Sequence, residues 1–238
     1  MAAEPAASPS AIPSPDVATV QNVRPPPPEQ IPDLDPRALY GGDIMFDVVR
    51  KGDKVGEHRM TFTKDANGDL NVRAEFHLAV EVMFIKAYTF DYTAHEIWRG
   101  KQLVALAAKA DDDGEVTETT ARLEDGLFKI NSSKHGATLA SSWVFATNHW
   151  NRGQVESTVL LNTLTGKLDR VKIENKGEEI IGTASGPVEA THFLYTGELH
   201  DTDTWYDKEG RWVKMSFKAK DGSIIDYICR RCGIAIGE

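Results

Sequence analysis

The stretch VRAEFHLAVEVMF, residues 72–84, alternates apolar and mostly polar side chains over its whole length. Every second residue from Val72 to Phe84 is apolar. Successive side chains of a strand point to opposite faces of a sheet, so this pattern predicts a long β-strand with one buried face. Tyr88, Phe90 and Tyr92 repeat the pattern directly afterwards and predict a second strand.

The same period of two continues on both sides of this stretch, from Leu39 onward. Between the apolar runs, glycine stands next to Asn or Asp at short, regular spacing, which is typical of tight hairpin turns. Helix is scarce, and 146–153 is expected to hold at most a turn or two. The further predicted strands are Ile44–Arg50, Val55–Lys64, Gln102–Ala110, Val116–Leu123, Lys167–Glu174, Glu189–Tyr195, Thr204–Asp207, Arg211–Ala219 and Ser223–Ile228.

A dozen strands joined mainly by hairpins predict a mostly β fold, an antiparallel meander. Because open strand edges invite aggregation, we expect this meander to curl into a closed or half-open barrel. The predicted barrel-like domain spans residues 38–238. Residues 1–37 form an Ala/Pro/Ser-rich arm that holds ten of the chain's eleven prolines, and its composition predicts disorder. The arm is a docking peptide for a partner, a spacer that holds the domain away from an anchor, or a plain solvated tail.

The charge of the chain excludes some partners. A formal net charge of −9 disfavours nucleic acid, whose binding depends on Lys and Arg contacts to phosphates. No apolar run approaches the length of a membrane-spanning helix, so we expect no membrane span. The first residues lack the basic and apolar regions of a signal peptide. The chain is therefore either a mature periplasmic protein whose signal has been removed or a cytoplasmic protein.

Cys229 and Cys232 form a C-x-x-C pair near the end of the chain. No second pair completes a zinc site, and the motif follows a strand, whereas the redox motif of thioredoxins begins a helix. We expect a small disulfide that fixes the tail. Free thiols, or redox or metal chemistry, are the alternatives.

The seven histidines lie far apart in sequence and show no metal-ligand spacing, so neither a metal nor a cofactor is predicted. His149 and Asn151 belong to a polar segment between strands, where functional residues are common. Asn162 is a second polar insertion into apolar surroundings. The alternative for both asparagines is that they cap turns.

Aromatic side chains give the clearest indication of a ligand site. Trp98, Trp150, Trp205 and Tyr206 lie near predicted strand ends, and an aromatic barrel mouth with a few polar groups is a common small-molecule pocket. Glu96 shares a strand face with Trp98 and is a candidate carboxylate in an apolar wall, with a raised pKa. The alternative is a solvated Glu96, or one paired with Arg99.

Several segments together resemble an uncharacterised family of bacterial envelope β-rich proteins. The resemblance implies export to the periplasm and a curved sheet similar to lipoprotein-carrier or lipocalin-like half-barrels. It implies no established activity. The segments that carry it are Gly56–Arg59, Glu96–Gly100, His149–Asn151, Leu161-Asn162 with Thr165-Gly166, Trp205–Trp212 and Asp221–Tyr227.

Three functional hypotheses follow. The first is a periplasmic binding or carrier protein for an apolar or amphipathic molecule such as a lipid, held by the aromatic and polar candidates above. The second is an interaction protein that docks through its proline-rich arm. The third is a small isomerase or hydrolase with His149 or Glu96 as general base and Asn151 or Asn162 orienting the substrate. The sequence contains no recognised catalytic signature, which favours the first.

Overall fold

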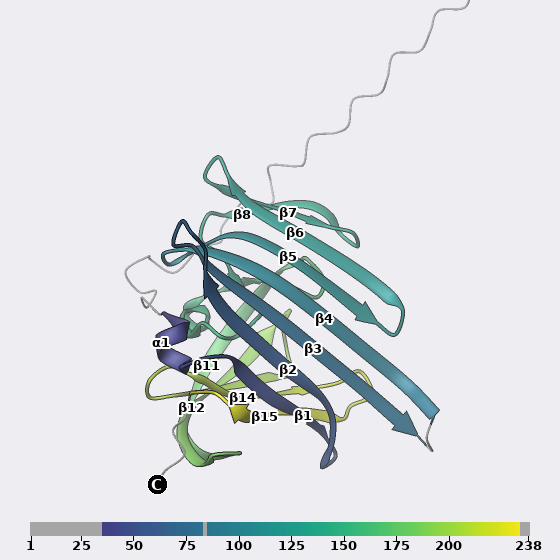
Figure 1. The fold of residues 1–238 in the computed structure, drawn as a ribbon. Helices are drawn as coiled ribbons and strands as arrows, with labels where there is room; N and C mark the ends of the chain where they lie inside the picture. The colour runs from purple at the N-terminus through teal and green to yellow at the C-terminus, as the bar shows by residue number, and fades with distance from the viewer. Residues whose placement is uncertain (1–34, 83–84, 234–238) are drawn as a thin grey trace, which may run out of the picture.

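The computed structural model describes residues 35–82 and 85–233, which form a 15-stranded sheet with one short α-helix and one short 3-10 helix (Figure 1). The elements in chain order are α1 (Pro36–Tyr40), β1 (Ile44–Arg50), β2 (Asp53–Lys64), β3 (Leu70–Val82), β4 (Ile85–Arg99), β5 (Gln102–Asp112), β6 (Glu115–Glu124), β7 (Leu127–Ser132), β8 (Gly136–Ser141), β9 (Phe145–Ala146), η3 (Arg152–Glu156), β10 (Val159–Leu161), β11 (Leu168–Thr183), β12 (Gly186–Gly197), β13 (Thr202–Asp207), β14 (Trp212–Lys218) and β15 (Ile224–Arg231).

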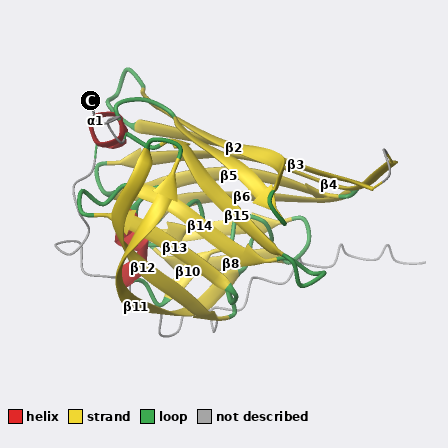
Figure 2. Cartoon of the chain, turned by 90° about the horizontal axis from the view of Figure 1, so that it is seen from below, coloured by secondary structure: helices red, strands yellow, loops and turns green. Residues whose placement is uncertain are grey.

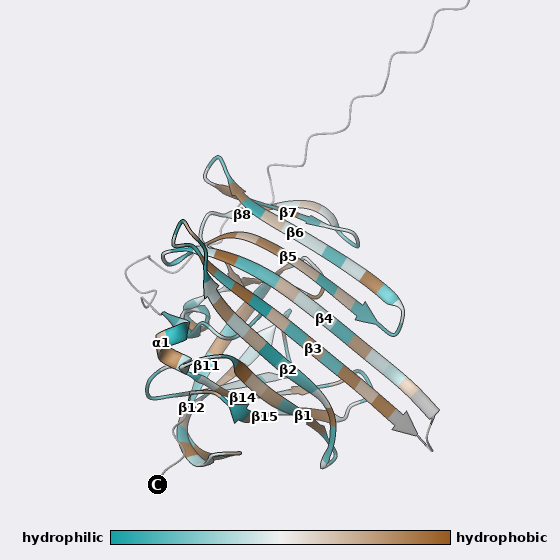
Figure 3. Cartoon of the chain, viewed as in Figure 1, coloured by the Kyte–Doolittle hydropathy of each residue, from teal (hydrophilic) through white to brown (hydrophobic). Residues whose placement is uncertain are grey.

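The two strands predicted from period-two alternation form a long hairpin, β3–β4. Their pairing runs from Leu70 opposite Trp98 to Val82 opposite Ile85. Val72 and Phe76 are buried on one face of β3, whereas Arg73 lies exposed on the other. Figure 3 shows the same alternation of hydropathy along neighbouring strands. The prediction of a long strand with one buried face is confirmed.

The strand order explains how the sheet becomes barrel-like. β1 lies between β2 and β15, so the first and last strands of the domain are neighbours. From this join the strands continue in order to β8 at one edge and to β9 at the other. In Figures 1 and 2 the sheet is strongly curled. Its described pairings do not join β8 to β9, so the predicted barrel is half-open.

Hairpin turns at one end of the barrel have the backbone that the Gly-containing dipeptides predict. Asp113 and Gly114, between β5 and β6, have φ values of 54° and 95°. Two consecutive residues of positive φ match the right-handed twist of the strands that they join. The β1–β2, β5–β6 and β14–β15 turns lie together at one end, where Arg50 pairs with Asp221 and Lys220 with Asp112, and α1 lies at the other end (Figure 1).

A loop helps to hold together the two sides of the curled sheet, namely the strands from β1 to β8 and the strands from β15 to β9. After β10, the chain turns at 162–167 and packs on β7, where the Ser132 hydroxyl donates to the Thr165 carbonyl at 2.7 Å. Gly166, at φ +74°, lies so close that a Cβ there would be 2.5 Å from Ser132 Cβ. This contact joins strands that lie many places apart in the sheet.

Some elements differ from the sequence-based predictions. The short strands β7–β10 were not predicted, because each contributes only two to six residues to the pattern. The strand predicted to end at Glu174 continues as β11 to Thr183, because Lys176-Gly177 forms a bulge and not a hairpin turn, and β12 pairs on both sides of it. The helical turns expected over 146–153 begin later, at Arg152, because Asn151 accepts from the Gly153 amide and caps η3 there.

The predicted arm lies almost wholly outside the described residues. The described chain begins at Asp35, which caps α1, and Tyr40 at the end of this helix is buried. Helix α1 therefore begins within residues assigned to the arm from sequence. No helix of the described chain is long and apolar enough to cross a membrane.

Candidate functional site: an interior cavity with a polar floor

The curled sheet encloses a cavity of about 810 Å³. Binding pockets for small molecules commonly fall in the range of roughly 300–1,000 Å³. Both sides of the curled sheet line it: β3 and β4 contribute from one side, and β14 and β15 contribute from the other. Its apolar walls include Phe76, Leu78, Phe90, Met215, Phe217 and Tyr227.

Charged side chains line the cavity at the end where the β1–β2, β5–β6 and β14–β15 turns meet. They form three ion pairs: Lys220 with Asp112, Lys134 with Glu115, and Arg50 with Asp221. Long charged side chains can cover apolar surface while their heads remain in water. We call this charged rim the mouth of the cavity.

Aromatic and histidine side chains form the inner part of the cavity, which we call the floor. His58 comes from β2, His149 from the segment before η3, and Trp212 from the start of β14. The Trp212 ring lies between the two histidines, with ring centroids 5.6 Å from His58 and 5.7 Å from His149. Each histidine is only 6% exposed. Residues distant in sequence therefore form one surface facing the cavity.

Three ring nitrogen atoms at this floor are buried without a hydrogen-bond partner among the described residues. They are both ring nitrogens of His58 and Nδ1 of His149. Burial lowers the pKa of His58 to about 3, with a smaller contribution from His149. Burial likewise lowers the pKa of His149 to about 4. Both rings are therefore neutral at neutral pH.

His149 also has an unusual backbone, with φ of +59°. The left-handed region is uncommon for residues other than glycine, and such conformations concentrate at functional sites. The His149 carbonyl accepts a hydrogen bond from the Tyr206 hydroxyl at 2.8 Å, which itself accepts from Gln154 Nε2 at 2.9 Å. Tyr206 therefore fixes the segment that presents His149.

Glu96 lies behind the floor, at the centre of a buried network. Its Oε2 accepts from Trp98 Nε1 at 2.7 Å and from Trp150 Nε1 at 3.0 Å, and its Oε1 accepts from the Asn148 amide. Burial raises the pKa of Glu96, and these three donors partly offset that rise. The raised pKa expected for Glu96 is present, but the carboxylate lies in a buried polar network behind the cavity and not in its apolar wall. Arg99 pairs with Asp69 instead of Glu96.

Asn148 connects this network to the cavity. Its Oδ1 is 2.6 Å from the Tyr92 hydroxyl, which is also 2.7 Å from Thr163 Oγ1. Asn148, Tyr92 and Thr163 all line the cavity, whereas Glu96 does not. These groups already bond to one another. The unpaired ring nitrogens of His58 and His149 are therefore the atoms of the floor with which a ligand can form hydrogen bonds.

The other predicted site residues fall into separate places. Asn162 lines the cavity, and its amide donates to Asp169 at 2.7 Å. Asn151 caps η3, as the alternative explanation proposed. Trp205 lies apart from the floor, stacked on His192 at 4.5 Å and below the Lys214 ammonium. Of the eight predicted ligand-binding residues, His149 and Asn162 line the cavity; Trp98 and Trp150 belong to the Glu96 network, and Tyr206 supports His149.

The sequence analysis missed His58, Tyr92, Asn148 and Trp212 as site residues. His58 carried a usable signal, because it occupies an inward position of β2 two residues before buried Met60. A polar residue at an apolar position of a strand indicates either a buried network or a ligand contact. Tyr92 lies in a predicted strand, Asn148 directly precedes His149, and Trp212 lies near a predicted strand end, but nothing in the sequence indicated that these three face the cavity.

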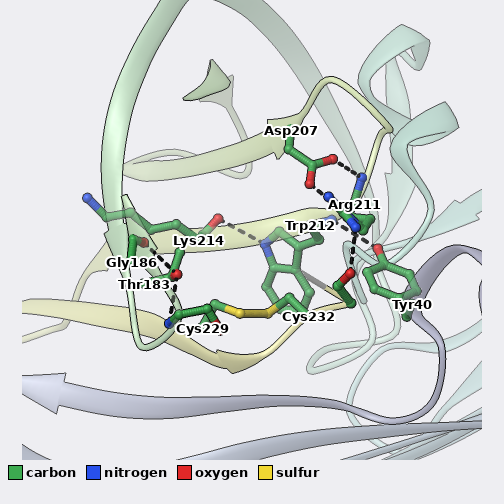
Figure 4. Close-up of a disulfide and its surroundings, with 11 residues drawn as sticks. Tyr40, Thr183, Gly186, Asp207, Arg211, Trp212, Lys214, Cys229 and Cys232 are labelled. Carbon is green, nitrogen blue, oxygen red and sulfur yellow. Dashed lines mark hydrogen bonds and ion pairs between the residues drawn. A yellow bond between two sulfur atoms is a disulfide. The ribbon is translucent and has the colours of Figure 1, made fainter. Parts of the chain in front are cut away.

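The predicted disulfide is present at the end of β15. Cys229 and Cys232 are bonded, and both are buried beside Trp212 (Figure 4). Tyr40 closes the same region: its hydroxyl donates to the Trp150 carbonyl and accepts from the Trp212 amide, at 2.8 and 2.9 Å. Among the described residues, no group of three His, Cys, Asp or Glu side chains lies where it could hold a metal ion.

Comparisons with known proteins agree with the barrel-like architecture. A crystal structure titled as a β-barrel-like protein of the domain of unknown function DUF1849, from Brucella abortus, superposes with a TM-score of 0.56 at 14% sequence identity, covering 82% of this chain and 98% of that one. At this identity the similarity concerns the fold alone. No curated protein matches the chain. The model of the domain of unknown function DUF6134 matches residues 46–230, and the chain therefore belongs to the DUF6134 family.

Proposed function

We propose that this protein binds an apolar or amphipathic small molecule in its interior cavity and acts as a periplasmic binding or carrier protein. The observation that carries this proposal is the cavity of about 810 Å³ between two apolar sheet faces. Burying a ligand's apolar surface there contributes roughly 25 cal/mol per Å². Phe90 and Phe217 remain half-exposed although they point into the barrel, so a ligand has apolar surface to cover.

The floor supports binding better than catalysis. A general base works best when its pKa lies near the working pH. Burial holds the pKa of His149 at about 4, and Glu96 lies behind the cavity wall. An isomerase or hydrolase using either residue is therefore the weaker proposal. It would require turnover that disappears when His149 is replaced by Asn.

The proposed compartment follows from the cysteine pair. Disulfides form and persist in oxidising environments such as the bacterial periplasm. The Cys229–Cys232 bond therefore favours the periplasm over the cytoplasm. The proline-rich arm, as a docking segment for an envelope partner, remains a separate proposal.

Solvent extraction tests the binding function. Protein purified from periplasmic extract is treated with organic solvent, and the extract is analysed by mass spectrometry. We expect a stoichiometric apolar or amphipathic compound that is absent from a sample denatured by heat and washed before extraction. An empty extract, together with no uptake of the apolar dye N-phenylnaphthylamine, would contradict the proposal.

A cavity-filling substitution tests where the ligand lies. Ala110 of β5 is 4% exposed and lines the cavity, whereas Ala107 of the same strand lies exposed on the opposite face. We expect Ala110→Phe to reduce dye binding at least tenfold because the new ring occupies the cavity. Ala107→Phe, the matched control, should bind as the wild type does. Equal binding by both variants would place the dye elsewhere.

A further inference from the structure

The two buried histidines of the floor hold three ring nitrogens to which no other described residue hydrogen-bonds. His58 is surrounded by aromatic rings, with centroids at 5.5 Å for Tyr227, 5.6 Å for Trp212 and 6.0 Å for Phe76. Its inward neighbours along β2 are Met60 and Phe62. An apolar side chain would satisfy such packing, so the polar edges of His58 have no structural purpose here.

Leaving these ring nitrogens unpaired is unfavourable. A buried donor or acceptor without a partner costs on the order of 1–3 kcal/mol, and native proteins pair the large majority of such groups. His58 has two unpaired nitrogens and His149 has one. Both residues line the cavity, and because the three nitrogens themselves have almost no exposed surface, a molecule bound there reaches them once the rings shift slightly toward it.

The neutral state of both rings limits which chemical group fits. A neutral imidazole has one N–H donor and one nitrogen acceptor. The two nitrogens of one ring point apart, so a single group pairs with one nitrogen of His58 and with Nδ1 of His149; a hydroxyl group, which donates one hydrogen bond and accepts another, complements a donor on one ring and an acceptor on the other. A carboxylate only accepts, and an ammonium only donates, so each would leave one nitrogen unmatched.

The surroundings further disfavour a charged group. The buried carboxylate nearest to this floor through hydrogen bonds is Glu96, which reaches the cavity wall through Asn148. A ligand carboxylate in this buried region would lose its hydration without gaining a cationic partner among the floor residues. The cationic side chains that line the cavity, such as Lys134 and Lys220, lie at the mouth.

We propose that His58 and His149 form a seat for the hydroxyl group of an otherwise apolar ligand, which enters with this group first. This inference rests on the proposed binding function and specifies its ligand class. The apolar body of the ligand then lies against Phe76, Phe90 and Phe217, with its far end at the charged mouth. The left-handed backbone of His149, held by Tyr206, positions its ring against Trp212, which His58 also contacts.

A matched series of competitors tests the seat. The full chain is loaded with N-phenylnaphthylamine, and the dye is displaced by dodecanol, dodecyl methyl ether, dodecanoate or dodecylammonium. The ether accepts a hydrogen bond but cannot donate one, so it isolates the donor of the ligand. We expect dodecanol to compete about tenfold better than the other three, as the loss of one or two hydrogen bonds predicts.

Variants then assign the effect to the histidines. His58→Leu should remove the advantage of dodecanol over its ether, measured as the ratio of the two inhibition constants in the same variant, so that a change in its dye affinity cancels. His149→Asn should reduce the advantage of dodecanol over its ether, and asparagine tolerates the left-handed backbone at this position. His77→Leu is the control, because His77 is exposed on the outer face of β3. Melting temperatures verify that each variant is folded.

The competition experiments distinguish a failure of the hydroxyl seat from a failure of the binding function. If dodecanol and its ether compete equally, or if dodecanoate competes best, the hydroxyl seat is wrong while the binding function stands. If His58→Leu keeps the full preference for dodecanol, His58 does not form the seat. If the wild type binds no dye and none of the competitors by direct titration, the binding function fails, and the seat fails with it.

Discussion

At the scale of single residues, the ring of His58 lowers the stability of the ligand-free protein but serves the proposed ligand contact. Its ring is buried among aromatic side chains, and both of its nitrogens are unpaired among the described residues. Stabilising substitutions are often available where a site needs a group that the fold does not. His58→Leu should therefore raise the free energy of unfolding of the ligand-free protein while it removes hydroxyl selectivity.

The same histidine makes stability depend on pH. The pKa of His58 falls from 6.5 in the unfolded chain to about 3 in the fold, and that of His149 falls to about 4. Below pH 6.5 the unfolded state therefore binds more protons, and stability is lost as the pH falls. In this window each buried histidine lowers the free energy of unfolding by about 1.4 kcal/mol for each unit by which the pH falls. Above pH 6.5 it has no such effect.

Urea unfolding at about pH 7 and about pH 5 measures this effect. The loss of unfolding free energy between these values should be about 2 kcal/mol smaller in His58→Leu than in the wild type. The control His77→Leu should match the wild type. An unchanged loss in His58→Leu would mean that His58 titrates normally and is not buried as described.

At the scale of elements, the loop at 162–167 connects the two sides of the curled sheet. It follows β10 yet packs on β7, and its residues Thr163, Leu164 and Thr165 also line the cavity. Its closest approach is at Gly166, where the positive φ and the nearby Ser132 leave no room for a side chain. This one loop therefore links the closure of the sheet to the shape of the cavity.

Two glycine substitutions separate these effects. Gly166→Ala adds a Cβ at 2.5 Å from Ser132 Cβ in a left-handed backbone of φ +74°. Gly126 has nearly the same φ, +75°, but open space around it. We expect about 1 kcal/mol of destabilisation for Gly126→Ala and about 3 kcal/mol for Gly166→Ala, measured by urea unfolding.

The dye titration gives this prediction a second readout. Gly166→Ala should also weaken N-phenylnaphthylamine binding, because three residues of its loop line the cavity. Gly126→Ala should leave binding unchanged. If the two variants were equally destabilised, the loop would not pack against β7 as tightly as its geometry requires.

At the scale of the whole molecule, the two sides of the curled sheet are joined by the pairing of β1 with β15. β1 pairs with β15, and every other pairing leads outward from there. The Cys229–Cys232 bond lies at the end of β15, next to Trp212 of the floor. Beyond it, the Gly233 carbonyl accepts from the Arg211 guanidinium, which also pairs with Asp207. These contacts fix the end of the last strand.

Removal of the disulfide should lower stability without unfolding the barrel. For such a short loop, the loss of chain constraint predicts about 2 kcal/mol. The double variant Cys229→Ala with Cys232→Ala should have a lower melting temperature, matching that of the wild type under reducing conditions. The reductant should not affect the double variant. A melting temperature equal to that of the oxidised wild type would show that the bond adds nothing to the join.

The sequence by itself determined the class of fold and the strands of the main hairpins. Period-two alternation depends only on neighbouring residues, so β1 and β3 could be located from sequence. Gly and Asp at turns fixed the hairpin connections for the same local reason, whereas Gly177 showed that a glycine can equally form a bulge. The disulfide could be expected because its two cysteines are three residues apart.

Only the tertiary structure decided which side chains meet. His58 and His149 are 91 positions apart in the chain, and they come together because β1 pairs with β15 and the sheet curls around Trp212. Glu96 and Trp98 were predicted to share a face, but only the fold placed them behind the cavity rather than in it. Strand alternation gives the face of each residue, whereas curvature and register decide what that face encloses.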